Sequence, residues 1–167
     1  MVVLVMGLPG SGKSFFARRL AKEVRMVYLS SDAMRIEMNL RGKYAPADRQ
    51  RVYAALEKSV ELALSRGDAV VVDATFQHRA NRLAFARISE KYQQLLACIQ
   101  VTATEAVVKR RLSKGREESE ADFAVHQKLK ANFDPIDQPH LTIYSEDGQI
   151  DAMINKAREY LNQAHEN

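Results

Sequence analysis

Residues 2–14 of the chain read Val2-Val3-Leu4-Val5-Met6-Gly7-Leu8-Pro9-Gly10-Ser11-Gly12-Lys13-Ser14. The apolar run at their start predicts a buried strand, and the segment after it has the spacing Gly-x-x-x-x-Gly-Lys-Ser. Glycines in these places let the backbone wrap closely around phosphate groups, with its N–H groups pointing inward. The alternative is a glycine-rich turn that binds nothing. Because a strand precedes the loop and a helix is predicted directly after it, the pattern favours a phosphate-binding loop, or P-loop.

The P-loop pattern also predicts which residues contact a nucleotide. Lys13 is expected beside the β- and γ-phosphates of ATP, and the Ser14 hydroxyl is expected to bind Mg²⁺. The residues expected to bind the nucleotide are Gly7, Pro9, Gly10, Ser11, Gly12, Lys13, Ser14 and Phe15. The sequence therefore predicts ATP and Mg²⁺ as cofactors.

Short β-branched runs alternate with longer helical patterns along the rest of the chain. Strands are predicted over residues 2–6, 26–29, 69–73, 95–101 and 141–144. Helices are predicted after the P-loop, over residues 49–66, 79–92, 105–114 and 120–132, and over a last segment from residue 150 to 164. This alternation is typical of an α/β fold in which helices cover both faces of a parallel sheet. We expect a single domain over residues 1–167.

Composition points to a cytoplasmic protein without membrane contact. The chain has 167 residues and 46% hydrophobic content, enough for a buried core without disulfides or structural metals. The single cysteine, Cys98, lies in an apolar run and is expected to be a small buried hydrophobe. No run is long enough to span a bilayer, and the N-terminal apolar run lacks the basic start of a signal peptide. A net charge of +4 is a mild excess that favours a polyanionic partner without requiring one.

Two acids follow predicted strands on the edge where the P-loop is expected. Asp32 comes just after strand 26–29, where it is placed to accept the proton of a hydroxyl that attacks the γ-phosphate. Arg35, three residues on, can share a helical face with Asp32 and bind a phosphate. Asp73 ends strand 69–73, where it can hold a magnesium-bound water or orient Asp32. Helix capping is the alternative role for both acids.

Basic residues are dense in the segment Val107-Val108-Lys109-Arg110-Arg111-Leu112-Ser113-Lys114-Gly115-Arg116. A helix that carries them can close over the triphosphate as a lid, with an arginine that stabilises the charge of the transferred group. Taken by itself, each of these residues fits a solvated face of a basic helix better. Arg111 and Arg116 are catalytic candidates only through the family resemblance that this segment shares with the motifs above.

Together with the P-loop, Ser31-Asp32-x-x-Arg35 and Val72-Asp73-Ala74-Thr75, this basic segment resembles the polynucleotide 5′-hydroxyl kinase-like P-loop kinases. The chain is similar to their predicted-kinase or AAA-type ATPase branch. The resemblance implies a three-layer α/β/α P-loop NTPase fold, with a five-stranded parallel sheet in the order 2-3-1-4-5 and a helical lid after the fourth strand.

The resemblance also implies catalytic roles, for Lys13, Ser14, Asp32, Arg35 and Arg116. The chain departs from the family pattern at two places. Phe76 stands where polynucleotide kinases often have asparagine, and the interval from Arg111 to Arg116 is one residue longer than expected. The second departure leaves Lys114 or Arg111 open as the lid cation.

The leading hypothesis is an ATP-dependent phosphotransferase that acts on a hydroxyl group. The 5′-OH of a nucleic acid is the leading acceptor, and a small sugar, nucleotide sugar or antibiotic is the alternative. A regulatory P-loop ATPase without an acceptor is the second hypothesis. A GTPase switch is disfavoured, because the one Asn-Lys pair, Asn155-Lys156, lies on the last predicted helix. A nucleic-acid-binding module that uses ATP only structurally lacks support from a ladder of aromatic and basic residues.

Overall fold

The computed structural model describes residues 1–114 and 123–166. Helices and strands alternate along these residues in the order β1 (Val2–Met6), α1 (Lys13–Glu23), β2 (Val27–Ser30), α2 (Ser31–Glu37), α3 (Pro46–Ser65), β3 (Val70–Asp73), α4 (Arg79–Lys91), β4 (Leu96–Thr102), α5 (Glu105–Leu112), α6 (Phe123–Ala131), β5 (Leu141–Tyr144) and α7 (Ile150–Glu166). No helix within these residues is long and apolar enough to cross a membrane.

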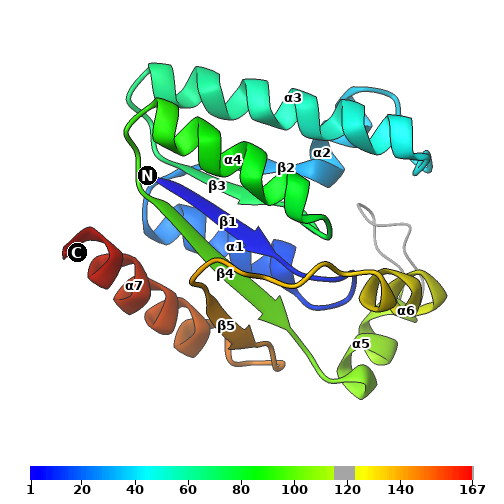
Figure 1. Ribbon diagram of the computed structural model, residues 1–167. Helices are drawn as coiled ribbons and strands as arrows, with labels where there is room; N and C mark the ends of the chain where they lie inside the picture. The colour runs from blue at the N-terminus through cyan, green and yellow to red at the C-terminus, as the bar shows by residue number, and fades with distance from the viewer. Residues whose placement is uncertain (115–122, 167) are drawn as a thin grey trace.

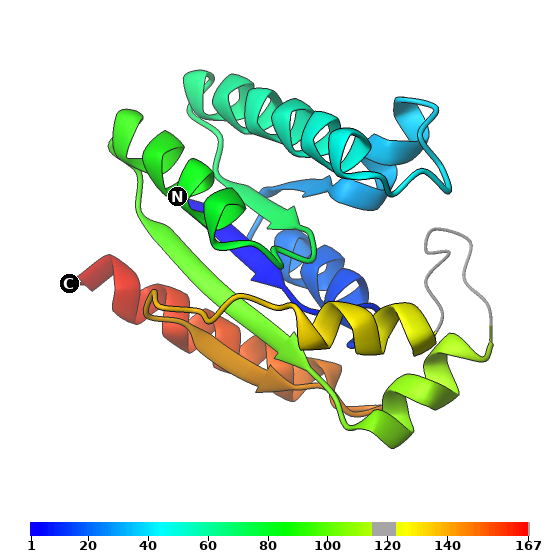
Figure 2. The same cartoon turned by 45° about the vertical axis from the view of Figure 1, so that its right-hand side comes forward.

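The strands form one five-stranded sheet in the order β2-β3-β1-β4-β5. Every neighbouring pair is parallel. Helices α1 and α7 cover one face of the sheet, and α3 and α4 cover the other (Figure 1). The arrowheads of β1 and β4 point toward the side on which α5 and α6 lie (Figure 2). The predicted fold class and strand order are therefore confirmed.

The central strand β1 is buried along its whole length. Val3 and Val5 pack with Phe16 and Leu20 of α1 on one face, and Leu4 packs on the other face in the cluster that includes α3. A strand covered on both faces needs apolar residues at every position, because neither face meets water. This is why the run from residue 2 to 6 is continuously apolar.

Cys98 on β4 is 1% exposed. Burial raises the pKa of its thiol to about 11, so the thiolate that would react is suppressed at neutral pH. Cys98 is a packing residue, as its apolar neighbours in the sequence predict.

The helices differ from the predicted ones in several places. Helix α2, which is not among the predicted helices, forms directly after β2, where the Ser30 hydroxyl accepts a hydrogen bond from the Ala33 N–H at 3.4 Å. Helix α3 begins at Pro46 and not at residue 49, because proline is favoured in the first helical turn. Helix α5 ends at Leu112, two residues before the predicted end. The predicted start of α6 at residue 120 lies outside the described residues.

A buried arginine connects the segment after α6 to the turn between β3 and α4 through hydrogen bonds. Arg82 is fully buried, and its guanidinium donates to the carbonyl oxygens of Phe76 at 2.8 Å, of Asp134 at 3.3 Å and of Pro135. The Asp134 carboxylate accepts a hydrogen bond from the backbone N–H of Arg79 at 2.8 Å and so caps the start of α4. These bonds hold the segment after α6 against the start of α4.

We predict that Arg82→Met lowers the free energy of unfolding by about 3 kcal/mol or more, because several buried carbonyl oxygens lose their donor at once. Arg79→Met is the matched control: that side chain is 60% exposed and pairs with Asp137 at 2.9 Å, a surface contact worth less than about 1 kcal/mol. Urea denaturation of both variants measures the difference. Equal losses in the two variants would contradict the anchoring role.

Candidate functional site

The backbone of the P-loop requires glycine at two positions. Gly10 and Gly12 adopt φ angles of 84° and 88°, in the left-handed region that residues with a Cβ rarely occupy. A Cβ on Gly10 would lie 2.8 Å from Cγ1 of Val108, and one on Gly12 would lie 2.7 Å from Oγ of Ser145. Both glycines are therefore needed for backbone conformation and for space.

The N-terminus of α1 comes directly after the P-loop. Gly12 is the N-cap and, having no side chain, makes no cap hydrogen bond to the first turn. The N–H groups of a first helical turn and the positive end of the helix dipole are suited to bind phosphate. Lys13 begins the helix and is 8% exposed, and Ser14 follows it, half-buried. The structure therefore brings together the residues that the motif predicted.

A cavity of about 450 Å³ lies beside the start of α1. Its lining includes Gly12, Phe15, Arg111, Asp147 and Met153. Phe15 is 67% exposed, although it is large and apolar. An exposed aromatic ring next to a guanidinium and apolar side chains offers a surface on which a planar group can stack.

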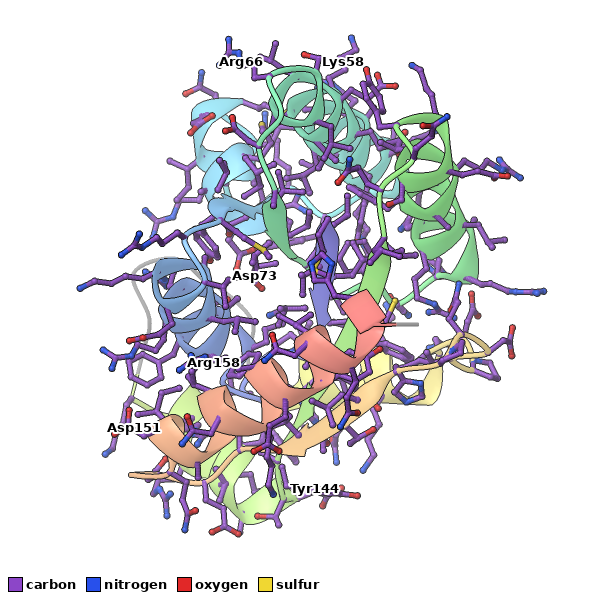
Figure 3. The ribbon with its side chains drawn as sticks, turned by 90° about the vertical axis from the view of Figure 1, so that its left-hand side faces the viewer. Lys58, Arg66, Asp73, Tyr144, Asp151 and Arg158 are labelled. Carbon is purple, nitrogen blue, oxygen red and sulfur yellow. The ribbon has the colours of Figure 1, made fainter. Side chains whose placement is uncertain are left out.

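Asp73 is buried at the end of β3, on the face of the sheet that α1 covers (Figure 3). Its Oδ2 atom accepts a hydrogen bond from the Tyr28 hydroxyl at 2.7 Å. Burial first, and then the neighbouring Asp73 carboxylate, raise the pKa of Tyr28, so that Tyr28 remains a donor at neutral pH. The Oδ1 atom has no hydrogen-bond partner among the described residues. Sequence reasoning missed Tyr28, because its contact with Asp73 joins two strands.

Asp32 lies in the first turn of α2 and is half-buried. Ser30, two positions before Asp32, pairs in register with Asp73 across the parallel strands β2 and β3, and Val5 of β1 pairs with Asp73 on the other side. The side chain that caps α2 is Ser30, so the capping role considered for Asp32 is filled by another residue. Asp32, Asp73 and the P-loop thus share one edge of the sheet, whereas the catalytic role of Asp32 stays a prediction.

Arg35 is turned into the protein. It is 8% exposed, its Nη1 atom donates to the Lys43 carbonyl oxygen at 2.6 Å, and its guanidinium lies 4.5 Å from the centre of the Tyr44 ring. In this position Arg35 holds the loop between α2 and α3. Its predicted contact with a phosphate remains a prediction.

Arg111 lies against the carbonyl side of the P-loop. Its Nη1 atom donates to the Ser11 carbonyl oxygen at 3.1 Å and to the Ser145 hydroxyl at 3.0 Å, and its Nη2 atom pairs with Asp147 at 2.9 Å. The hydrogen bonds from Arg111 to the Asp147 carboxylate, together with the charge of Arg110, hold the pKa of Asp147 below its usual value. The sequence contains no signal for Ser145 or Asp147. Arg116, the other predicted lid arginine, lies outside the described residues.

The residues at this edge fit a magnesium ion that keeps part of its water shell. Among residues 1–114 and 123–166, no group of three or more His, Cys, Asp and Glu side chains is placed to hold a metal. Mg²⁺ in nucleotide sites is bound by one or two protein oxygens together with phosphates and waters, and does not need such a cage. The Ser14 hydroxyl and the unpartnered Oδ1 atom of Asp73 are suitable ligands or water-holding groups.

A family model described as an AAA domain matches residues 2–136. The chain belongs to this family. Membership in this AAA domain family confirms the expected resemblance at the level of P-loop kinase-like proteins. The finer likeness to polynucleotide kinases stays a prediction.

Solved structures of other proteins share the fold of this AAA domain protein. A sugar kinase from Janibacter sp. HTCC2649 has a TM-score of 0.74 and 21% identity, covering 96% of this chain and 94% of its own. Kti12 from Chaetomium thermophilum in complex with ADP-AlF3 has a TM-score of 0.73 and 19% identity, covering 95% and 98%. The APS kinase CysC from Mycobacterium tuberculosis in complex with AMPPNP and APS has a TM-score of 0.71 and 19% identity, covering 96% of both. Identities this low show the fold alone.

We predict that Lys13→Ala weakens ATP binding by about 10- to 100-fold, because a charge-assisted hydrogen bond to phosphate is lost. The thermal midpoint should change by less than about 3 °C, since the side chain is not part of either core cluster. Lys22→Ala, which removes an exposed lysine from the last turn of the same helix, is the control and should bind ATP normally. Titration calorimetry with ATP and Mg²⁺ checks both, and unchanged affinity in Lys13→Ala would refute the assignment.

Proposed function

We propose that this AAA domain protein transfers the γ-phosphoryl group of ATP to a hydroxyl group of an acceptor. The observation that carries the proposal is that the P-loop shares one sheet edge with Asp32, which comes after β2, and Asp73, which ends β3. A phosphotransferase needs these elements together: a phosphate cradle, a base and an acid that supports the metal. The sugar kinase and the APS kinase of similar fold support a phosphotransferase.

In the proposed reaction, Asp32 accepts the proton of the acceptor hydroxyl. The hydroxyl oxygen forms a bond to the γ-phosphorus, and the bond from the γ-phosphorus to the β,γ-bridging oxygen breaks, so that ADP leaves. Lys13 and the N–H groups at the start of α1 stabilise the negative charge that develops on the phosphates. Mg²⁺, when held through Ser14 and Asp73, supplies further charge neutralisation.

The cavity beside Phe15 is the proposed site for the base of ATP. It adjoins Gly12 at the end of the P-loop, so a nucleotide whose phosphates lie in the loop can extend into it. Phe15 and the Arg111 guanidinium offer stacking contacts for a planar base.

The loop between α2 and α3 is the proposed acceptor surface. Arg41 and Lys43 are exposed on it, and Tyr44 is 40% exposed above the Arg35 guanidinium. Cations beside an exposed aromatic ring suit a single nucleic-acid strand, whose phosphates pair with the cations and whose base stacks on the ring. A polynucleotide 5′-OH end is therefore our leading acceptor.

Asp32→Asn tests the chemical step. The amide can hydrogen-bond the acceptor but cannot take its proton, so phosphoryl transfer should fall by about 10²- to 10⁴-fold while ATP affinity stays within about twofold. Asp151→Asn removes an acid from the first turn of α7, where the side chain is exposed (Figure 3), and should not change transfer. Transfer from labelled ATP to 5′-OH oligonucleotides, nucleosides, sugars and aminoglycosides measures the effect. If Asp32→Asn loses thermal stability but keeps transfer, Asp32 is not the base.

The salt dependence of the acceptor KM tests the acceptor class. If about three phosphates of a single strand are contacted, raising the salt from roughly 50 to 200 mM should increase KM by about 10- to 20-fold through counterion release. The double variant Arg41→Ala/Lys43→Ala should raise KM at low salt and flatten this dependence.

Lys58→Ala/Arg66→Ala is the charge-matched control for that experiment. It removes two exposed cations, Lys58 of α3 and Arg66 at the C-cap of that helix, both at the top of the view in Figure 3, and should leave KM unchanged. A flat salt response that the Arg41/Lys43 change does not affect would rule out a polynucleotide acceptor. ATP hydrolysis without transfer to any tested acceptor would favour a regulatory ATPase.

A further inference from the structure

Side chains from helices α5 and α6 bind carbonyl oxygens of the P-loop. The carbonyl oxygen of Ser11 accepts a hydrogen bond from Nη1 of Arg111 in α5 at 3.1 Å. The carbonyl oxygen of Pro9 lies 2.7 Å from Nδ1 of His126 in α6. Sequence reasoning gave no role to His126, which is separated from Pro9 by 117 positions.

His126 is held in place by its surroundings. It is 5% exposed, and its ring stacks on the ring of Phe123 with the planes 8° apart and the centroids at 5.7 Å. The Phe123 ring also has a second contact, because Nζ of Lys109 lies 4.7 Å from its centre. Because a carbonyl oxygen can only accept, Nδ1 of His126 must carry the proton and donate it to Pro9.

The two bonds to carbonyl oxygens determine where the neighbouring N–H groups point. A trans peptide group is planar, so its N–H points opposite to its C=O. Holding the carbonyl of Pro9 outward therefore turns the N–H of Gly10 inward, and holding the carbonyl of Ser11 outward does the same for Gly12. The N–H between them, on Ser11, is already bonded to the Leu8 carbonyl oxygen at 3.1 Å.

We propose that His126 is a positioning residue for the nucleotide phosphates: its Nδ1–H holds the Pro9 carbonyl outward, so that the Gly10 N–H faces the phosphate site. The proposal rests on the proposed ATP site, but it concerns binding and not transfer. Loss of this hydrogen bond should weaken the binding of nucleotides that carry a β-phosphate more than the binding of AMP, because the loop encloses the phosphates beyond the first.

The test compares three variants of the full chain. His126→Phe keeps a ring that can stack on Phe123 but has no donor, whereas His126→Asn places an amide N–H close to the position of Nδ1. His140→Phe is the matched control, because it also removes a histidine whose Nδ1 meets a carbonyl oxygen, that of Gln138 at 2.9 Å. Dissociation constants for ADP and AMP are measured by titration calorimetry for each.

We expect His126→Phe to weaken ADP about 10-fold, the size of one hydrogen bond, and AMP by less than about twofold. His126→Asn should recover most of the ADP affinity, and His140→Phe should match the wild type. Wild-type ADP affinity in His126→Phe, or an equal loss for ADP and AMP, would overturn the proposal.

A measurement on the wild-type protein covers the case in which His126→Phe does not fold. The ¹⁵N NMR signals of His126 should show the proton on Nδ1, and a proton on Nε2 alone would overturn the proposal. A wild type that binds ADP with this pattern and yet transfers no phosphate would refute the proposed function while leaving the positioning role intact.

Discussion

The turn from β1 into α1 is the constraint on which the rest of the site depends. Within residues 7–12 the backbone must change direction, keep N–H groups on the inside for phosphate and leave its carbonyl oxygens on the outside. Buried carbonyl oxygens need donors, since an unsatisfied one costs free energy. Arg111 and His126 supply donors from α5 and α6. Helices α5 and α6 therefore help to hold the backbone conformation of the loop.

The parallel sheet explains why residues far apart in sequence meet at this loop. In a parallel sheet the carboxyl ends of all strands lie at one edge, so whatever follows β1, β2 and β3 gathers there. The P-loop, Asp32 and Asp73 occupy those three positions. The two acids differ in their burial. Asp73 is enclosed beside Tyr28, whereas Asp32 remains half-buried in the first turn of α2.

Arginine side chains connect separate backbone segments at several points around the site. Arg82 binds carbonyl oxygens of the segment after α6, and Arg35 binds the Lys43 carbonyl oxygen in the loop before α3. A guanidinium carries several donors in one plane and stays charged, so a single side chain can satisfy carbonyls from separate segments. Basic residues that the sequence suggests for phosphate binding are thus also used to hold backbone.

The P-loop, the strands and the acids at the strand ends can be predicted from the sequence, and the strand order follows from the family resemblance. The P-loop and the strands are carried by contiguous residues whose spacing reflects local geometry, such as the apolar run before Gly7 and the glycines around Ser11. Where Arg35, Arg82, Arg111 and His126 point becomes visible in the folded chain alone. Each of them meets at least one backbone carbonyl oxygen, a group that every residue has, and for Arg111 and His126 that carbonyl is 100 and 117 positions away. The amino-acid sequence cannot reveal which carbonyl oxygen becomes the partner, because that oxygen comes within reach only when the backbone folds.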